Sequence, residues 1–350
     1  MGDSKTKMKA VVKTREALGA ELLDIDIPDI GPKDVLVKVR AAAICGSDIY
    51  IYNWTPYAQG RIKPPLIFGH EMSGEVVETG EQVTNVKEGD IVAVETHIPC
   101  GTCFQCQTGA NHLCRNVAIF GVDTDGAFAE YAKVPEVCCW KLHKGTSYDL
   151  GAILEPLGVA VHGILADDVN GKSVAVFGCG PIGLFAIGAA AAFGAVQTFA
   201  LEVIPRRLAM VHQLAPEAIL VNPREQDPVA AIMEATDGLG VDVAIELSGN
   251  VEAASQAFKV LRHRGRISLV GVPTGLIELN AYKDIIRKEA KILGVWGRLV
   301  WQTWWQVQNL LAMGKFDPLS VVTHRFPLAD YAQAIELATS HEAGKILLYP

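Results

Sequence analysis

The pattern of apolar and polar positions changes character near the middle of the chain. In the first 150 residues, short apolar or alternating runs at residues 9–14, 21–27, 34–43, 72–79 and 90–95 are separated by glycine, proline and aspartate. Such runs predict a β-rich, barrel-like, largely antiparallel domain. From about residue 158, strand-like runs alternate with helix-like segments, which is typical of a parallel sheet covered by helices. The pattern therefore predicts an α/β protein with two domains.

The second half contains enough strand-like runs for a complete doubly wound sheet. The expected strands are residues 174–178, 196–201, 218–221, 241–247, 266–270 and 291–295. Two expected helices, 302–313 and 329–340, are followed by a closing strand at 345–349, which we expect to return to the first domain. The domain boundaries expected from this pattern are 1–157, 158–297 and 298–350.

A glycine-rich turn follows the first strand of the second domain. Gly178, Gly180 and Gly183 have the spacing G-x-G-x-x-G, and an alanine-rich helix is expected at residues 184–193. The first glycine permits a tight turn, the second lets a pyrophosphate approach the backbone, and the third lets strand and helix pack closely. The N-terminus of the helix offers free N–H groups to the phosphates. This context predicts a dinucleotide site, although a similar turn in another doubly wound sheet is an alternative.

The next strand ends at Glu202, where a carboxylate can hold both ribose hydroxyls of NAD and repel the 2′-phosphate of NADP. Arg206 and Arg207 follow closely and weaken that preference. The candidate cofactor-binding residues are Gly178, Gly180, Ile182, Gly183, Glu202, Arg206, Arg207 and Val272.

Four cysteines in the first domain have the spacing of a closed metal site. Cys100, Cys103, Cys106 and Cys114 read C-x2-C-x2-C-x7-C. Four thiolates can complete a zinc tetrahedron and leave no position for a substrate, so we expect this site to hold a loop in place. An iron–sulfur cluster or four free thiols are the alternatives.

A second set of possible ligands is scattered along the chain. Cys45, His70, Glu71 and Glu155 supply one thiolate, one imidazole and two carboxylates. A thiolate, an imidazole and one carboxylate would leave the fourth position of a catalytic zinc open. Spacing alone does not show that these residues meet.

Composition restricts the class of partner. Acidic residues outnumber basic ones by 39 to 31, and the chain has no long basic run, which argues against nucleic acid or an anionic membrane as the main partner. The N-terminal stretch lacks the apolar region of a secretory signal, and no apolar run is long enough to span a bilayer. Eight cysteines without an export signal favour thiols or metal thiolates. We therefore expect a cytoplasmic protein that acts on a small molecule.

Together, the GHE segment, the four-cysteine lobe, G-x-G-x-x-G and EPLG resemble the zinc-dependent medium-chain alcohol dehydrogenases from about residue 9 to the end of the chain. The resemblance implies a GroES-like catalytic domain and a Rossmann domain, with NAD and two zinc ions, one catalytic and one structural. Within the family, the stretches ICGSDIYIYNW, VETHIPCG, IFGVDTDGAFAEY and GVWGRLVWQTWW are most similar to the branch that oxidises L-threonine.

The resemblance also implies roles for individual residues. Cys45, His70 and Glu155 match the ligands of the catalytic zinc, and Glu71 matches a carboxylate able to enter its coordination sphere. Ser47 matches the residue that passes on the substrate proton. His97 and Arg298 match residues expected near the substrate.

Two positions depart from the pattern. Tyr50 stands where the family usually has a histidine that completes the proton relay, so we expect proton release to be slower or to run through water. Val159 follows EPLG where the threonine enzymes usually have asparagine, and EPLGVAVH is more similar to the sorbitol and butanediol dehydrogenases. The expected reaction is oxidation of a secondary alcohol, with L-threonine as substrate and 2-amino-3-oxobutanoate as product. A polyol or 2,3-butanediol substrate, or a non-catalytic zinc- and nucleotide-binding scaffold, are the alternatives. Many relatives are homotetramers, and this assembly is expected here.

Overall fold

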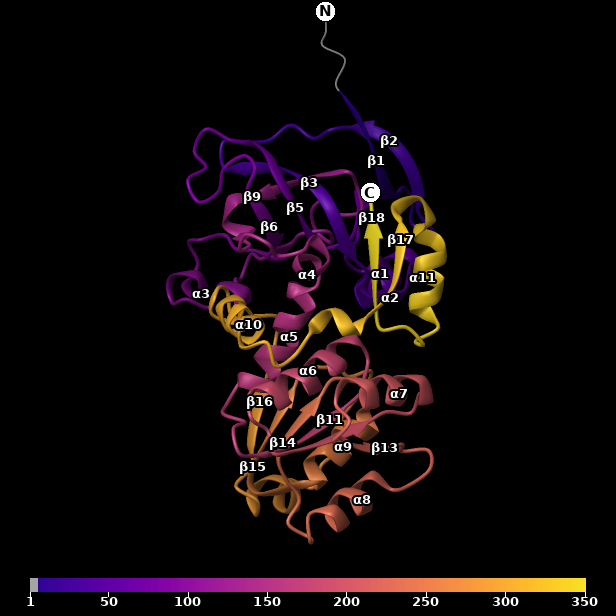
Figure 1. Cartoon of the computed structure of the whole chain (residues 1–350). Coiled ribbons are helices and arrows are strands. Elements are labelled where there is room, and N and C mark those ends of the chain that lie inside the picture. Colours follow the sequence, from indigo (N-terminus) through magenta and orange to yellow (C-terminus); the bar gives the residue numbers. More distant parts are fainter. Residues whose placement is uncertain (1–5) are drawn as a thin grey trace, which may run out of the picture. The chain divides into compact units, whose positions relative to one another are not determined.

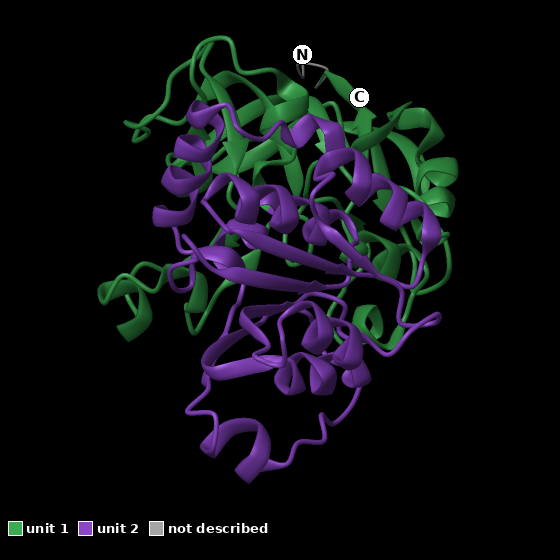
Figure 2. Cartoon of the chain, turned by 60° about the horizontal axis from the view of Figure 1, so that its bottom comes forward, with its two compact units in different colours: residues 1–155, 322–350 green, residues 156–321 purple. Residues whose placement is uncertain are grey.

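Residues 6–350 are described by the structure, a computed structural model in which the chain forms two compact units (Figures 1 and 2). One unit comprises the chain up to Glu155 together with Val322–Pro350. The other comprises Pro156–Val321. Residues 298–321, which the sequence pattern grouped with the returning segment, belong to the second unit.

The first unit is built on largely antiparallel sheets, with one parallel strand pair at an edge of the larger sheet. A seven-stranded sheet has the order β10-β6-β5-β3-β18-β17, with β9 also paired to β3, and a three-stranded sheet has the order β2-β1-β4. The strands are β1 (Lys7–Lys13), β2 (Glu21–Asp26), β3 (Asp34–Ala43), β4 (Leu66–Ile67), β5 (Glu71–Thr79), β6 (Ile91–Val94), β7 (His97–Ile98), β8 (Ala118–Ile119), β9 (Tyr131–Pro135), β10 (Cys139–Lys141), β17 (Val322–Pro327) and β18 (Lys345–Tyr349). The helices are α1 (Gly46–Tyr52), α2 (Pro56–Gln59), α3 (Phe104–Gln107), α4 (Tyr148–Ala152) and α11 (Tyr331–Thr339).

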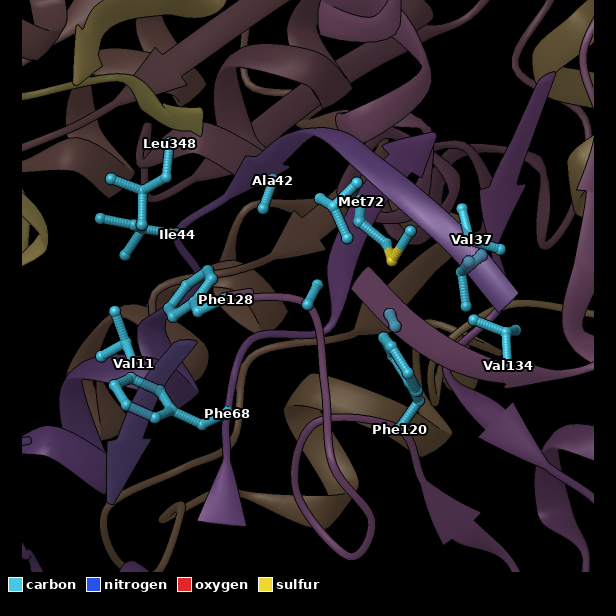
Figure 3. Close-up of a cluster of buried hydrophobic side chains, with 14 of the residues drawn as sticks. Val11, Val37, Ala42, Ile44, Phe68, Met72, Phe120, Phe128, Val134 and Leu348 are labelled. Carbon is cyan, nitrogen blue, oxygen red and sulfur yellow. The ribbon is translucent and has the colours of Figure 1, made fainter. Parts of the chain in front are cut away.

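The core of this unit draws on both ends of the chain. Phe68 and Phe128 pack edge to face with ring centroids 5.1 Å apart, and Val11 and Leu348 belong to the same buried cluster (Figure 3). Leu348 lies on β18, which pairs antiparallel with β3. The expectation that the closing strand returns to the β-rich domain is therefore confirmed.

The second unit has a parallel sheet in the order β13-β12-β11-β14-β15-β16. This order is that of the complete dinucleotide-binding fold, as the alternating pattern predicted. The strands are β11 (Ser173–Phe177), β12 (Gln197–Leu201), β13 (Ile219–Val221), β14 (Val241–Glu246), β15 (Leu261–Leu269) and β16 (Lys291–Gly294). The helices are α6 (Pro181–Ala192), α7 (Pro205–Leu214), α8 (Pro228–Ala235), α9 (Val251–Lys259) and α10 (Gln302–Met313), and α5 (Leu154–Leu165) leads into the unit.

Proline and capping residues explain where several of these helices begin. Pro181, Pro205 and Pro228 stand at the starts of α6, α7 and α8, where a missing N–H breaks no helical hydrogen bond. Asp227 and Asn250 accept N–H bonds as N-caps of α8 and α9. The helix expected at 184–193 thus begins three residues earlier, inside the glycine motif.

Among the described residues, no helix combines the length and the apolar character that a membrane span requires.

Candidate active site

The GHE segment meets the end of β3 at a metal-type cluster. Cys45, His70 and Glu71 each offer a ligand atom, and these atoms lie within 4.8 Å of one another. Cys45 is the N-cap of α1, directly after β3, and Glu71 begins β5. Because β3 and β5 pair with Ala43 opposite Glu71, residues far apart in sequence converge. This convergence was expected from the resemblance and not from spacing.

Glycines make the approach to His70 possible. Gly69 has φ +92°, a conformation that glycine adopts readily and other residues rarely do. A Cβ on Gly121 or Gly126 would come within 2.1 Å of the Gly69 carbonyl oxygen, so the two segments can approach only without side chains there. The glycines therefore fix the course of the chain immediately before the cluster.

Negative charge is concentrated around His70. Burial lowers the pKa of the His70 imidazole, but the Cys45 sulfur, and then the Asp48 and Glu155 carboxylates, raise it to about 10. Asp48 Oδ2 accepts the Cys45 N–H at 2.8 Å, and its Oδ1 lies 3.8 Å from His70 Nδ1. Glu155 lies near enough for its charge to act on this group, although its oxygens fall outside the cluster within 4.8 Å.

The donor set fits a zinc ion. His70 Nδ1 is buried and makes no hydrogen bond within residues 6–350, and the surrounding thiol and carboxylates supply the negative charge that a divalent cation neutralises. Cys45, His70 and Glu155 offer one sulfur, one nitrogen and one carboxylate. This combination is suited to a zinc with one position open.

Glu71 has a partner that the sequence analysis missed. Lys345 Nζ, from β18, lies 2.7 Å from Glu71 Oε1 and 2.6 Å from Oε2, and both side chains are buried. Burial raises the pKa of Glu71, and the positive charge of Lys345 limits that rise to about 7. The only sequence signal was a lysine at the start of an otherwise apolar strand.

Helix α1 carries Ser47, which the resemblance makes the proton acceptor, and Tyr50, which stands in place of the usual relay histidine. Ser47 Oγ is buried and has no hydrogen-bond partner among the described residues. Tyr50, one helical turn later, is 51% exposed. The helix therefore connects a buried hydroxyl near the metal-type cluster with a phenol at the surface.

His97 is held by a carboxylate that the sequence analysis also missed. Glu95 Oε1 lies 2.6 Å from His97 Nδ1 and accepts the His97 N–H at 3.0 Å, and both residues are buried. β6 pairs antiparallel with β5, with Ala93 opposite Ser73, so the chain leaving β6 runs toward the end of β5 that begins with Glu71. The local pattern E-x-H was the available signal.

The four-cysteine lobe is also assembled. The sulfurs of Cys100, Cys103, Cys106 and Cys114 lie within 4.8 Å of one another, and all four cysteines are free of disulfides. Backbone N–H groups of Thr102 and Cys103 lower the pKa of Cys100 to about 6, whereas desolvation and the Cys103 thiol raise that of Cys106 to about 12. The lobe fits a second, closed zinc site.

In the second unit, the glycine motif has the expected geometry. Gly178 has φ +93°, and a Cβ on Gly183 would lie 2.0 Å from the Gly178 carbonyl oxygen. Gly180 is the N-cap of α6, and Ile182 is half-buried in its first turn. The first and third glycines are therefore required by the turn and by close packing.

The Glu202 carboxylate is fixed at the end of β12. It accepts N–H bonds from Cys179, Val203 and Ile204 at 2.8 to 3.1 Å. Arg207 Nη1 lies 3.6 Å from Glu202 Oε2, whereas Arg206 is exposed. Of the two arginines, Arg207 is therefore the one beside the acid.

A further turn lies beside the glycine motif. Glu246, at the end of β14, accepts the N–H groups of Ser248 and Gly249. A Cβ on Gly178 would lie 2.9 Å from Ser248, and one on Gly249 would lie 2.5 Å from the Val272 carbonyl oxygen. The loops after β14 and β15 therefore meet the loop after β11 at the carboxyl end of the sheet, where dinucleotides bind in this type of fold. Val272 itself is 74% exposed.

Arg298 packs against α5. The residue is 1% exposed, and a Cβ on Gly158 would lie 2.5 Å from its Cδ. His162, on the same helix, lies 3.0 Å through Nδ1 from the Gly297 carbonyl oxygen. Gly297 and Arg298 are thus fixed to α5, the helix that also carries Val159.

Comparison with known proteins agrees with this architecture. The family model described as alcohol dehydrogenase GroES-like domain matches residues 31–144, and that described as zinc-binding dehydrogenase matches residues 181–313. The chain is 47% identical to L-threonine 3-dehydrogenase of Symbiobacterium thermophilum over 98% of each chain.

Solved structures agree as well. 2R,3R-butanediol dehydrogenase from Bacillus subtilis is 34% identical, with a TM-score of 0.88 over 98% of this chain and 99% of that one. A zinc-binding dehydrogenase structure from Sinorhizobium meliloti, bound to NADP, is 29% identical, with a TM-score of 0.91 over 99% and 100%. The fold, the glycine motif and the two metal-type clusters agree with these relationships, and the chain belongs to the zinc-dependent medium-chain alcohol dehydrogenase family.

Proposed function

We propose that the protein oxidises the secondary hydroxyl of L-threonine with NAD⁺ and forms L-2-amino-3-oxobutanoate. The observation that carries the proposal is the convergence of Cys45, His70 and Glu71 beside the Glu155 charge and the buried Ser47 hydroxyl. Identity to a named L-threonine 3-dehydrogenase over 98% of the chain supports the choice of substrate.

We assign the first unit to catalysis and the second to NAD. Cys45, His70 and Glu155 would hold the catalytic zinc, with Glu71 at its edge, and the four-cysteine lobe would hold the structural zinc. When bound, the zinc supplies Lewis-acid chemistry at the substrate hydroxyl and NAD⁺ accepts the hydride. Gly178, Gly180, Ile182, Gly183 and Val272 would contact the cofactor, with Glu202 on the ribose and Arg206 and Arg207 nearby.

The remaining steps belong to side chains of this protein. Ser47 Oγ, which has no partner among residues 6–350, would accept the proton of the substrate hydroxyl and release its own. Because the exposed Tyr50 stands where the family usually has the relay histidine, the released proton would reach solvent through water. We assign His97, which Glu95 holds through Nδ1, to the substrate ammonium, and Arg298 to the substrate carboxylate.

Specific observations favour a second candidate. Val159, directly after EPLG, is typical of the polyol and butanediol dehydrogenases. The chain also shares 34% identity with a butanediol dehydrogenase structure. The test is NADH formation by zinc-loaded protein with L-threonine, 2,3-butanediol and sorbitol. We expect the highest kcat/KM with L-threonine and a preference for NAD⁺ over NADP⁺. A higher kcat/KM with a diol or polyol would move the assignment to that branch. No turnover despite two bound zinc ions per chain would favour a non-catalytic scaffold.

We also propose that the protein is a cytoplasmic homotetramer. Eight free cysteines suit a reducing compartment. β16 is an edge strand of its sheet, with Ile292 43% exposed and Trp296 52% exposed shortly after it, so it offers a partly apolar edge for pairing with a second copy. Sedimentation equilibrium should give four chains per particle.

A further inference from the structure

Lys345 is a buried cation next to the proposed catalytic metal site. It is 3% exposed, and the next three residues of β18 are 0 to 1% exposed. A buried ammonium persists only when it is paired and hydrogen-bonded, because its removal from water is costly. Its contacts therefore indicate what the charge does.

Three oxygens surround the Lys345 ammonium. Nζ lies 2.7 and 2.6 Å from the two carboxylate oxygens of Glu71 and donates to the Ile44 carbonyl oxygen at 2.8 Å. Two of these contacts, to Glu71 Oε1 and to the Ile44 carbonyl oxygen, are hydrogen bonds, whereas Glu71 Oε2 is in ion-pair contact only and has no hydrogen-bond partner among residues 6–350. Both carboxylate oxygens of Glu71 thus lie within ion-pair distance of the lysine.

The C-terminal strand is what brings this charge to the site. β18 pairs with β3, with Leu347 opposite Ala43, and Ala43 is also opposite Glu71 on β5. Lys345 therefore lies beside the segment that carries Cys45, in the same sheet as Glu71.

Glu71 has two possible cations. Its carboxylate belongs to the cluster whose ligand atoms lie within 4.8 Å of one another, so a metal held by Cys45 and His70 would be within its reach. We propose that Lys345 is a positioning residue that holds Glu71 out of the coordination shell of the catalytic metal and so keeps one position open for the substrate hydroxyl. This proposal rests on the zinc site assigned under the proposed function.

Charge balance supports this role. A Cys45 thiolate and the Glu155 carboxylate can neutralise a divalent ion, while Lys345 pairs with Glu71 and its positive charge also acts on the buried Asp48 carboxyl. Without Lys345, the buried Glu71 carboxylate loses its counter-ion, and the metal becomes the nearest cation that can compensate it. Glu71 would then occupy the position needed by the substrate.

The test uses full-length protein loaded with Co²⁺, whose visible bands shift when one ligand of the metal is replaced by another. The variants are Lys345→Met, Lys345→Arg, Glu71→Gln and the double variant Glu71→Gln/Lys345→Met. The four-cysteine lobe contributes equally to all of them, so difference spectra report the catalytic site. Metal content and thermal unfolding are measured for each protein.

We expect the Glu71→Gln and Lys345→Arg spectra to match that of the unmodified protein. Lys345→Met should shift the visible bands and lower kcat/KM by about 10- to 100-fold, the range for residues that position metal ligands. The double variant should regain the unmodified spectrum, because it has no carboxylate left to bind the metal.

Three results would overturn the proposal: a changed spectrum for Glu71→Gln alone, an unchanged spectrum for Lys345→Met, or a double variant that keeps the Lys345→Met spectrum. If Lys345→Met does not fold, Glu71→Gln still decides, since a changed spectrum would mean that Glu71 binds the metal despite Lys345. A Cys45→Ala control separates the two hypotheses. If its cobalt spectrum equals that of the unmodified protein, the catalytic metal site itself fails.

Discussion

The two metal-type clusters of the first unit are assembled in different ways. Cys100, Cys103, Cys106 and Cys114 lie on one short segment, and turns within that segment bring them together. Cys45 and the His70–Glu71 pair come instead from the ends of two strands, and their charged neighbours come from elsewhere in the chain. One cluster is local, and the other depends on the whole sheet.

The charged surroundings differ as well. Three of the four lobe cysteines are partly exposed, and their thiols interact mainly with N–H groups and thiols of the same segment. In the other cluster, His70 and Glu71 are buried among Asp48, Glu155 and Lys345. Buried charges are costly unless they are partnered, so a site of this kind persists where chemistry requires it. From this comparison we expect the local cluster to stabilise the fold and the dispersed one to perform the reaction.

The largest expected effect tests the dispersed cluster. Cys45→Ala removes a metal ligand, and the loss of several kcal/mol of transition-state stabilisation should lower kcat/KM by about 1,000-fold or more. Tm should also fall, although the sheet pairing of β3 and β5 remains, because loss of the metal removes a cation from beside the buried Glu155 carboxylate. The matched control is Cys139→Ala, a buried cysteine in neither cluster, which should keep its activity. Comparable losses in both variants would contradict the assignment.

The opposite result is expected for the lobe. Cys103→Ser should release one zinc per chain and destabilise the protein by about 3 kcal/mol, lowering Tm by roughly 6 to 12 °C. Below the new Tm, kcat should stay within about a factor of three, because the closed site leaves no position for substrate. Zinc analysis, calorimetry and initial rates measure the three quantities. Loss of turnover without loss of stability would break the comparison between the clusters.

The same contrast explains what the sequence could predict. The four-cysteine lobe and the Gly178 turn were predicted because each is a short segment whose spacing determines its geometry. The meeting of Cys45 with His70 depends on how β3 pairs with β5, and only the resemblance suggested it.

Long-range partners escaped prediction altogether. Lys345 begins an apolar strand, and a lysine there is ordinarily exposed, so this one local signal did not identify Glu71 as its partner. In the sequence, Glu95 is an acidic residue after a predicted strand, and only the structure shows that its carboxylate lies beside His97. The start of α5 at Leu154 was also missed, although Pro156 fits the first turn of a helix. In each case the missing information was which segments pack together.

An intermediate effect is expected for Glu95→Gln, which tests whether the dispersed site depends on its buried carboxylates. An amide oxygen can still accept from His97, but the charge-assisted hydrogen bond is lost, at a cost of about 1.5 to 3 kcal/mol. The kcat/KM for L-threonine should fall about 10- to 100-fold, mainly through KM if His97 binds the substrate. Glu88→Gln makes the same change at an exposed position and should have no effect. Equal losses with L-threonine and an uncharged diol would argue against a role for His97 toward the ammonium group.

The smallest effect is expected where an ion pair of the first unit is partly open to solvent. Arg61 Nε and Nη2 donate to the two Asp123 carboxylate oxygens at 2.9 and 2.6 Å, and Ile119 N–H also donates to Asp123. Burial raises the pKa of Asp123, but Arg61 and then the Ile119 N–H outweigh it, so the pKa lies below its ordinary value. The pair therefore contributes stability above the pKa of the unfolded chain, near 4, and loses it as pH falls through the lower folded value. Asp123→Asn should lower Tm at pH 7 by about 2 to 4 °C, corresponding to about 1 kcal/mol, and the difference from the unmodified protein should shrink as pH falls below 4. A difference in Tm that stays constant down to pH 2 would mean that the amide introduced by Asp123→Asn disturbs packing. The Arg61–Asp123 pair would then not stabilise the protein through its charge.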